Sequence, residues 1–144
     1  MTKTRPTVLV AEDHAGILEK VSKLLCKDFN VVGAVMDGAA ALVDATRLNP
    51  DVVVMDITMP HLDGIQAASQ IRKNGTASRI VFFSVNEDPD LIAEVLETGA
   101  SGYVIKSRLN SDLVFAIEEA LAGRVFVSTI ALRPRAASSL NGDQ

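Results

Sequence analysis

Five polar residues of this sequence could act together, because each stands at the end of a short apolar run or just after it. The acidic pair Glu12-Asp13 follows the first run, and Asp56 follows the third. Ser84 closes the fourth run, and Lys106 follows the fifth. In an open parallel sheet, ligands bind beyond the carboxyl ends of the strands. If the first and third runs are neighbouring strands, three carboxylates therefore converge at one edge of the sheet.

Three carboxylates at contact distance repel one another, and each would take up a proton unless a positive charge lay among them. Oxygen ligands of this kind suit a hard octahedral cation such as Mg²⁺, with Mn²⁺ as a substitute. Zinc is disfavoured, since His14 and His61 have no cysteine partner. A carboxylate beside such a cation can be the covalent nucleophile in phosphoryl transfer. Lys106 would add a compact positive charge, and Ser84 a hydroxyl donor.

The apolar runs have the composition of strands that are buried on both faces. They are mostly rich in valine and isoleucine and lack strict alternation of apolar and polar residues. Between them, apolar residues recur at the spacing of amphipathic helices. The runs are Val8–Ala11, Val31–Met36, Val52–Met55, Ile80–Val85 and Gly102–Ile105, and the helical stripes are Ile17, Val21, Leu24 and Leu25; Leu91, Ile92, Val95 and Leu96; and Leu113, Val114, Ile117 and Leu121.

Boundary residues support a strand and helix pattern that is repeated five times. Asp88-Pro89 is typical of a helix start, and Asn49-Pro50 ends the second helix. Gly99 and Gly123 are typical of helix C-termini. Strands joined by single helices run parallel with right-handed crossovers. We therefore predict an α/β fold with a five-stranded parallel sheet in the flavodoxin-like order 2-1-3-4-5 and helices on both faces.

Length and composition indicate one soluble domain. The 144 residues suffice for one hydrophobic core, and no apolar run approaches the length of a membrane-spanning helix. The N-terminal segment 1–6 lacks the features of a signal peptide, so we expect a cytoplasmic protein. The 14 basic residues are scattered among 18 acidic ones and form no stripe for nucleic acid. We interpret the single cysteine, Cys26, as a small buried hydrophobe rather than a nucleophile.

Residues 129–144 differ in composition from the rest of the chain. They are rich in Ala, Arg, Pro, Ser, Asn and Gly and show no apolar periodicity. We expect a domain at residues 7–128 followed by a linker-like or disordered tail. Within that tail, Arg133-Pro134-Arg135 is interpreted as a basic linker rather than a DNA contact.

The ordered set Glu12, Asp13, Asp56, Ser84 and Lys106 at successive strand ends resembles the signature of response-regulator receiver domains of two-component signal transduction. Taken singly, either aspartate could merely cap a helix or stabilise a turn. That explanation does not account for carboxylates at adjacent strand ends with a lysine opposite. The ordered set is therefore the specific signal.

The resemblance extends over residues 7–128 and includes sequence around the five sites. Met59-Pro60 and Gly64 follow the central aspartate, and the segment 98–103 leads into the last strand with an aromatic residue at the family's usual position. The stretch 116–128 is similar to receivers of the branch with a C-terminal helix-turn-helix output domain. The resemblance thus implies a receiver of that branch.

The family implies a role for each acidic position. Asp56 would accept a phosphoryl group from the phosphohistidine of a sensor histidine kinase. Asp13 would bind Mg²⁺ directly and Glu12 mostly through water. Asp56 would be a further ligand, and the backbone carbonyl of Thr58 would complete the set. Lys106 would bridge to the phosphate. The chain would then be a phosphoacceptor switch that assists only its own phosphorylation and dephosphorylation, not a turnover enzyme.

Two further residues would form the switch itself. Ser84 would follow the phosphoryl group inward, and Tyr103 would turn inward to fill the space vacated. Because Tyr103 would transmit the change, we hypothesise that the fourth helix, fifth strand and fifth helix form the partner or homodimer surface.

The sequence departs from the family pattern at two positions. Glu12 replaces the commoner aspartate, and we expect only a modest change in cation affinity. Ser107 follows Lys106 where many receivers have proline, so the turn into the last helix could differ. The family also suggests that Thr58 and Asn86 tune how fast water removes the phosphate.

The sequence argues against two other functions. A phosphatase of the haloacid-dehalogenase type needs a second aspartate two residues after the nucleophile, where Thr58 stands. A flavin-binding module needs a small-residue phosphate loop after the first strand, where Glu12-Asp13-His14 would repel a phosphate. The output stays open between the receiver part of a DNA-binding transcription regulator, with the DNA contact in an output domain outside this chain, and a stand-alone receiver acting through protein contacts.

Overall fold

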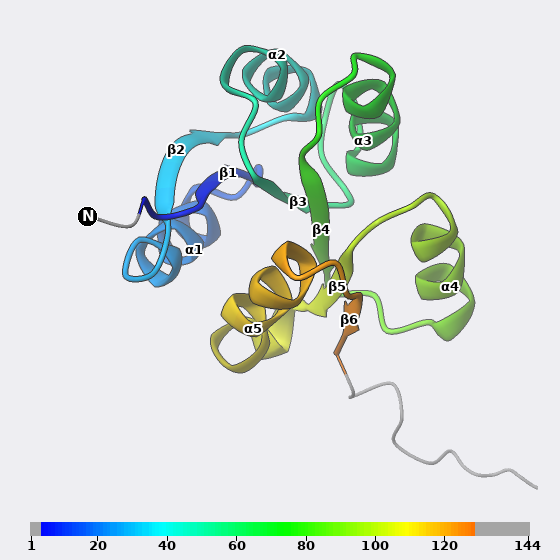
Figure 1. The fold of residues 1–144 in the computed structure, drawn as a ribbon. Coiled ribbons are helices and arrows are strands. Elements are labelled where there is room, and N and C mark those ends of the chain that lie inside the picture. Colours follow the sequence, from blue (N-terminus) through cyan, green and yellow to red (C-terminus); the bar gives the residue numbers. More distant parts are fainter. Residues whose placement is uncertain (1–3, 129–144) are drawn as a thin grey trace, which may run out of the picture.

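The computed structural model describes residues 4–128, and within them six parallel strands form one sheet in the order β2-β1-β3-β4-β5-β6 (Figure 1). The strands are β1 (Thr7–Ala11), β2 (Asn30–Val35), β3 (Val52–Asp56), β4 (Arg79–Ser84), β5 (Gly102–Ile105) and β6 (Phe126–Val127). The helices are α1 (Ala15–Leu25), α2 (Gly38–Leu48), α3 (Gly64–Lys73), α4 (Pro89–Glu97) and α5 (Leu109–Leu121), and a 3₁₀ turn, η1 (Lys106–Arg108), leads into α5.

The predicted α/β fold and the order of the first five strands are confirmed, whereas the prediction of five strands missed β6. This strand pairs with the outer edge of β5, with Gly102 opposite Phe126 and Tyr103 opposite Val127. A strand of two residues is too short to show any periodicity in the sequence. β6 forms because its backbone can pair with the outer edge of β5.

Two hydrophobic cores lie on the two faces of the sheet, which explains why the strands are continuously apolar. Alternate residues point to opposite faces, so Val8 and Val10 belong to one core, while Leu9 belongs to the other. Helices α1 and α5 cover the first face, and α2, α3 and α4 cover the second (Figure 1). The large buried side chains on β3, β4 and β5 make the centre of the sheet rigid.

The predicted helix boundaries agree with the backbone. Asp88 accepts a hydrogen bond from the backbone of the first turn of α4, which begins at Pro89. Asn49 ends α2 in the left-handed conformation, with φ 45°. Gly99 and Gly123 also have positive φ, of 95° and 83°, which glycine adopts without the steric cost of a side chain.

Two expectations about burial were wrong or overextended. Cys26 is exposed, because it lies one residue beyond the last buried position of α1, where its thiol donates to the carbonyl of Lys23. The apolar runs were also carried one residue too far, since Met36 and Val85 lie outside the strands and are 44% and 75% exposed. Apolar character does not reveal where a hydrogen-bonded ladder stops.

The expected tail at residues 129–144 lies outside the described residues. Over residues 4–128, no helix combines the length and the apolar character needed to cross a membrane.

Candidate functional site

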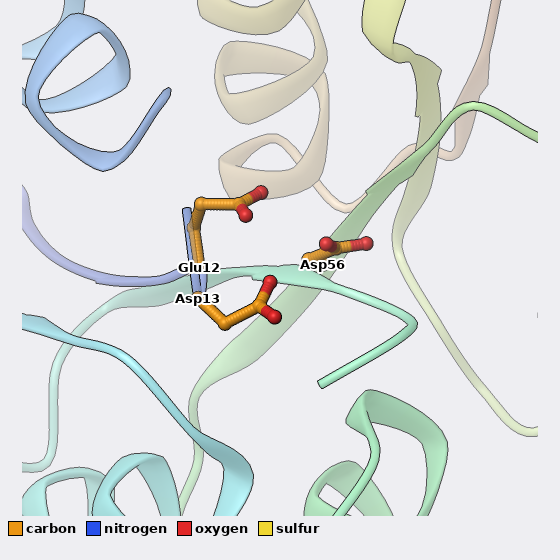
Figure 2. Close-up of side chains that lie close together, drawn as sticks. All are labelled: Glu12, Asp13 and Asp56. Carbon is orange, nitrogen blue, oxygen red and sulfur yellow. The ribbon is translucent and has the colours of Figure 1, made fainter. Parts of the chain in front are cut away.

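The order of the strands brings the predicted acidic residues together. Strand β1 lies beside β3, with Ala11 opposite Met55, so the residues that follow them meet at one edge of the sheet. Carboxylate oxygens of Glu12, Asp13 and Asp56 all lie within 4.8 Å of one another. Figure 2 shows the three side chains gathered beyond the ends of β1 and β3.

The three carboxylates differ in their exposure to solvent. Glu12 is fully buried, with 0% exposure, and Asp56 is buried too, whereas Asp13 is exposed. Burial raises the pKa of Glu12, and the hydrogen bond from the His14 backbone and the nearby ammonium group of Lys106 only partly offset this effect. The cluster therefore has a protected interior and one side open to solvent.

Lys106 supplies the opposing charge. Its Nζ lies 3.0 Å from Glu12 Oε1 and 3.0 Å from Asp56 Oδ2, and 5.4 Å from the centre of the Phe83 ring. Burial lowers the pKa of this ammonium group, but the two carboxylates outweigh burial, so the pKa of Lys106 is raised. The lysine therefore stays charged and partly neutralises the acidic cluster.

Backbone groups hold two of the carboxylates in place. The N–H of His14 donates to Glu12 Oε2 at 2.8 Å, and the N–H of Thr58 donates to Asp56 Oδ1 at 3.3 Å. The other oxygen of Glu12 is buried and makes no hydrogen bond of good geometry to any residue in the described part of the chain. Its 3.0 Å contact with Lys106 is an ion pair that leaves lone pairs free for a further partner.

These features fit a hard divalent cation. Magnesium prefers a few carboxylate or carbonyl oxygens and keeps several waters, which an acidic cluster with one exposed carboxylate allows. Glu12 offers an oxygen without a hydrogen-bond partner in the described residues, and Asp13 offers an exposed carboxylate. Both are oxygen ligands of the kind that such a cation prefers.

Ser84 and Tyr103 meet at the start of the loop that follows β4. Ser84 is buried, and its Oγ accepts a hydrogen bond from the N–H of Asn86 at 3.0 Å. Tyr103 is also buried, and its hydroxyl donates to the carbonyl of Asn86 at 2.8 Å. Burial raises the pKa of Tyr103, so its hydroxyl keeps its proton and remains a donor. In this structure, Tyr103 is thus already turned inward and fastens the loop between β4 and α4.

The loop between β3 and α3 is held by contacts that sequence reasoning missed. His61 has φ 71° and pairs through Nδ1 with Asp37 Oδ2 at 3.2 Å. Asp37 also caps α2, and its bond from the Ala40 N–H is the main reason that its pKa is lowered. A side chain at Gly38 would collide with the backbone of Leu62. No spacing rule predicts these contacts, because they join two loops that are distant in the sequence.

Gly64 has a comparable role next to Asp56. A Cβ atom at Gly64 would collide with the carbonyl oxygen of Asp56, and the Gly64 N–H donates to the carbonyl of Ile57 at 2.7 Å. The N-terminus of α3 therefore packs directly on the strand end that carries the central aspartate.

Residues 106–108, which include Ser107 at the position where many receivers have proline, form the 3₁₀ turn η1.

Comparison with known proteins agrees with this geometry. The family model described as "Response regulator receiver domain" matches residues 8–118. The nitrate/nitrite response regulator protein NarL of Escherichia coli (strain K12) is 32% identical over 140 residues, which cover 96% of this chain and 64% of NarL. The transcriptional regulatory protein DegU of Brevibacillus brevis is 30% identical over 122 residues, which cover 83% of this chain and 52% of DegU. The chain thus spans about half to two thirds of the length of these relatives.

Solved structures show the same similarity. The signal receiver domain of NarL from Mycobacterium tuberculosis is 32% identical with a TM-score of 0.80, over 85% of this chain and 100% of that one. A two-component response regulator of the LuxR family from Aurantimonas sp. SI85-9A1 is 33% identical with a TM-score of 0.84, over 90% of this chain and 94% of that one. The chain belongs to the family of response regulator receiver domains.

Proposed function

We propose that this chain is a phosphorylation-dependent signalling switch in which Asp56 accepts a phosphoryl group from a sensor histidine kinase. The observation that carries the proposal is the convergence of three carboxylates opposite the ammonium group of Lys106. An oxygen of Asp56 forms the new bond to phosphorus while the bond to the donor's imidazole nitrogen breaks. The charges facing Asp56 then stabilise the acyl phosphate.

Glu12, Asp13, Asp56 and the backbone carbonyl of Thr58 would hold Mg²⁺, with Mn²⁺ as a substitute. When bound, the cation neutralises charge on the phosphoryl oxygens. Lys106 now pairs with Asp56 Oδ2, and it would turn this ammonium group to a phosphoryl oxygen. The chain would assist only its own phosphorylation and dephosphorylation.

Ser84 and Tyr103 would carry the conformational change. The Ser84 hydroxyl now accepts from the Asn86 N–H, and it would turn to donate to a phosphoryl oxygen. The Tyr103 hydroxyl already donates to the Asn86 carbonyl, so the loop after β4 would be held in place while the Ser84 hydroxyl turns. The phosphoryl group shifts the population only by binding this arrangement more tightly than the alternative.

We propose that the output of this switch is regulation of transcription. We also propose that the protein acts in the cytoplasm. The relatives include proteins named as response or transcriptional regulators, and this chain covers 64% or less of the relatives compared above. We propose that DNA is contacted by an output domain outside this chain. The alternative is a stand-alone receiver that acts through protein contacts.

We also propose a homodimer or partner surface formed by α4, β5 and α5. Strand β6 pairs with the outer edge of β5, so the edge strand that this surface presents is β6 rather than β5. It also presents Phe115 of α5, which is 50% exposed and packs edge-on against Phe126 of β6 at 5.3 Å between ring centres.

Labelling with acetyl phosphate tests the acceptor. The wild-type chain with Mg²⁺ should gain one phosphate by intact-mass measurement, and Asp56→Asn or an excess of chelator should abolish the gain. Asp28→Asn, at an exposed position outside the cluster, is the matched control and should label normally. Full labelling of Asp56→Asn would assign the acceptor elsewhere, and undiminished labelling in chelator would exclude the metal.

A further inference from the structure

The end of the described chain is fastened to the strand that leads into Lys106. Ser128 is 1% exposed, and its backbone N–H donates to the carbonyl of Tyr103 at 3.0 Å. Its hydroxyl donates to Asp112 Oδ2 at 2.8 Å and accepts from the N–H of Ile105 at 3.0 Å. A serine one residue beyond a short strand is thereby tied to two residues of β5 and to α5.

Asp112 is the charged centre of this arrangement. It lies in the first turn of α5, is buried, and accepts hydrogen bonds from Arg108 Nε at 2.8 Å and Ser111 Oγ at 3.0 Å. Burial alone would raise the pKa of Asp112, but the hydrogen bonds from Arg108, Ser128 and Ser111 outweigh burial and lower it. A buried carboxylate is tolerated when its oxygens are bonded in this way.

The pairing of β6 with β5 is weak without Ser128. Strand β6 has two residues, and the bond from the Phe126 N–H to the Ser101 carbonyl is long, at 3.4 Å. Isolated short strands contribute little stability of their own. The bonds of Ser128 are shorter and buried, so they add a polar attachment to the packing of Phe126 and Val127 on the two cores.

The same bonds fix the backbone from which Lys106 reaches the acidic cluster. The N–H of Ile105, one residue before Lys106, is held by Ser128. Lys106 begins η1, and the last residue of η1, Arg108, donates from its guanidinium Nε to Asp112 Oδ2 at 2.8 Å. Lys106 therefore lies between the Ile105 backbone, which Ser128 holds, and Arg108, whose guanidinium Asp112 holds.

We propose that Ser128 and Asp112 are positioning residues for Lys106: they hold β5 and η1 so that the ammonium group is already aimed at Asp56. Restraint of this kind lowers the entropy lost when Lys106 binds a phosphoryl oxygen. Because the coupling is reciprocal, occupation of the acidic site also tightens the attachment of the segment at Ser128. The effect on ligand binding rests on the proposed function, whereas the restraint itself does not.

Amide hydrogen exchange tests the restraint in the full chain. In Ser128→Ala the amide of Ile105 loses its acceptor, so its exchange should accelerate by about tenfold or more. Ser78→Ala is the matched control, because it removes a hydroxyl that bonds to the Pro50 carbonyl far from β5. Unchanged exchange at Ile105, or equal acceleration in both variants, would overturn the proposal.

Binding of beryllofluoride with Mg²⁺ tests the positioning of Lys106. We expect Ser128→Ala to weaken it by about fivefold or more, as is typical of coupling between sites, while Ser78→Ala leaves it unchanged. Ser128→Thr keeps the hydroxyl and should recover most of the affinity, and Asp112→Asn should weaken binding, whereas Glu119→Gln on the same helix should not. Equal affinity in Ser128→Ala and wild type would refute the positioning role. If the wild-type chain binds no beryllofluoride, the proposed function fails, and the exchange result alone then decides whether the restraint exists.

Discussion

At the scale of single residues, the structure explains what Glu12 does in place of a shorter aspartate. Its longer side chain lets one oxygen accept the His14 N–H at 2.8 Å while the other reaches Lys106 at 3.0 Å. Full burial raises the pKa of this carboxyl, so its ionised form is costly without Lys106 or a cation nearby. Glu12 therefore links the lysine to the proposed cation site.

Glu12→Gln should weaken Mg²⁺ binding. The amide keeps the shape of the side chain but removes one negative charge from the cluster, and we expect a loss of about tenfold or more in affinity. The chain has no tryptophan, so calorimetric titration is the suitable measurement. Glu19→Gln, which alters only an exposed pair with Lys23, should bind as the wild type does. Equal affinity in both variants would remove Glu12 from the cation site.

Tyr103→Phe should destabilise the loop after β4. It removes the hydroxyl that donates to the Asn86 carbonyl at 2.8 Å, and the loss of one such hydrogen bond costs about 1 kcal/mol. Urea unfolding measures the free energy, and faster exchange confined to residues 85–88 would locate the effect. A variant as stable as the wild type, with normal exchange there, would show that the bond holds nothing in place.

At the scale of elements, the end of β3 is determined by what packs against it. Helix α3 begins at Gly64, whose missing side chain allows the helix to lie against the Asp56 carbonyl. The N-terminus of α2 approaches the same loop at Gly38. The position of the proposed acceptor therefore depends on two close backbone contacts.

Gly64→Ala should be more damaging than an ordinary glycine substitution. Its methyl group would meet backbone that cannot move aside, and we expect a loss of about 3 kcal/mol in the free energy of unfolding. Gly75→Ala is the control, since a side chain there meets nothing within 4 Å and only the positive φ opposes it, at about 1 kcal/mol. Chemical denaturation compares the two, and equal losses would show that Gly64 has no special packing role.

The first turn of α5 should make stability depend on acid pH. The pKa of Asp112 is lowered in the folded chain, so its contribution is complete above its unfolded value of about 3.9 and disappears as the pH falls through the folded value. The difference in unfolding free energy between wild type and Asp112→Asn should therefore shrink between pH 6 and pH 2.5. Urea midpoints across this range check it, and a constant difference would mean that the ionised carboxylate contributes nothing.

At the scale of the whole molecule, the three-layer arrangement, with helices on both faces of the sheet, places all the proposed chemistry at the carboxyl ends of the strands. The surface of α4, β5 and α5 lies at the far side of the sheet from β2 (Figure 1). Tyr103 lies on β5, which belongs to this surface, and its hydroxyl bonds to the loop that follows β4. Only β4 separates β3, which ends at Asp56, from β5. A change at Asp56 can thus reach this surface through β4.

Beryllofluoride should promote association of the chain, and Phe115→Ser should prevent it. Phe115 is half exposed on the proposed surface, and a buried aromatic anchor is typical of interfaces. Val43→Ser is the control, because Val43 is exposed on α2, on a different part of the molecule. Light scattering after gel filtration measures the mass, and association that persists in Phe115→Ser would place the interface elsewhere.

The sequence by itself determined the fold and the convergence of the acidic residues. Valine-rich runs separated by helical stripes require a parallel sheet, and a parallel sheet collects its strand ends at one edge. With the first and third strands as neighbours, as the predicted order places them, Glu12 and Asp13 come close to Asp56. Local signals of helix capping were also reliable, because Asp88 and Gly99 affect only backbone that lies a few residues away in the sequence.

Only the tertiary structure decided the contacts between segments that are distant in the chain. The exposure of Cys26, the strand β6, the pairing of His61 with Asp37 and the bond from Ser128 to Asp112 leave no periodic trace in the sequence. Periodicity reports which face of an element is buried, but hydrogen-bond partners depend on how the packed elements finally approach one another. The positions of polar side chains around Lys106 are therefore properties of the assembled molecule.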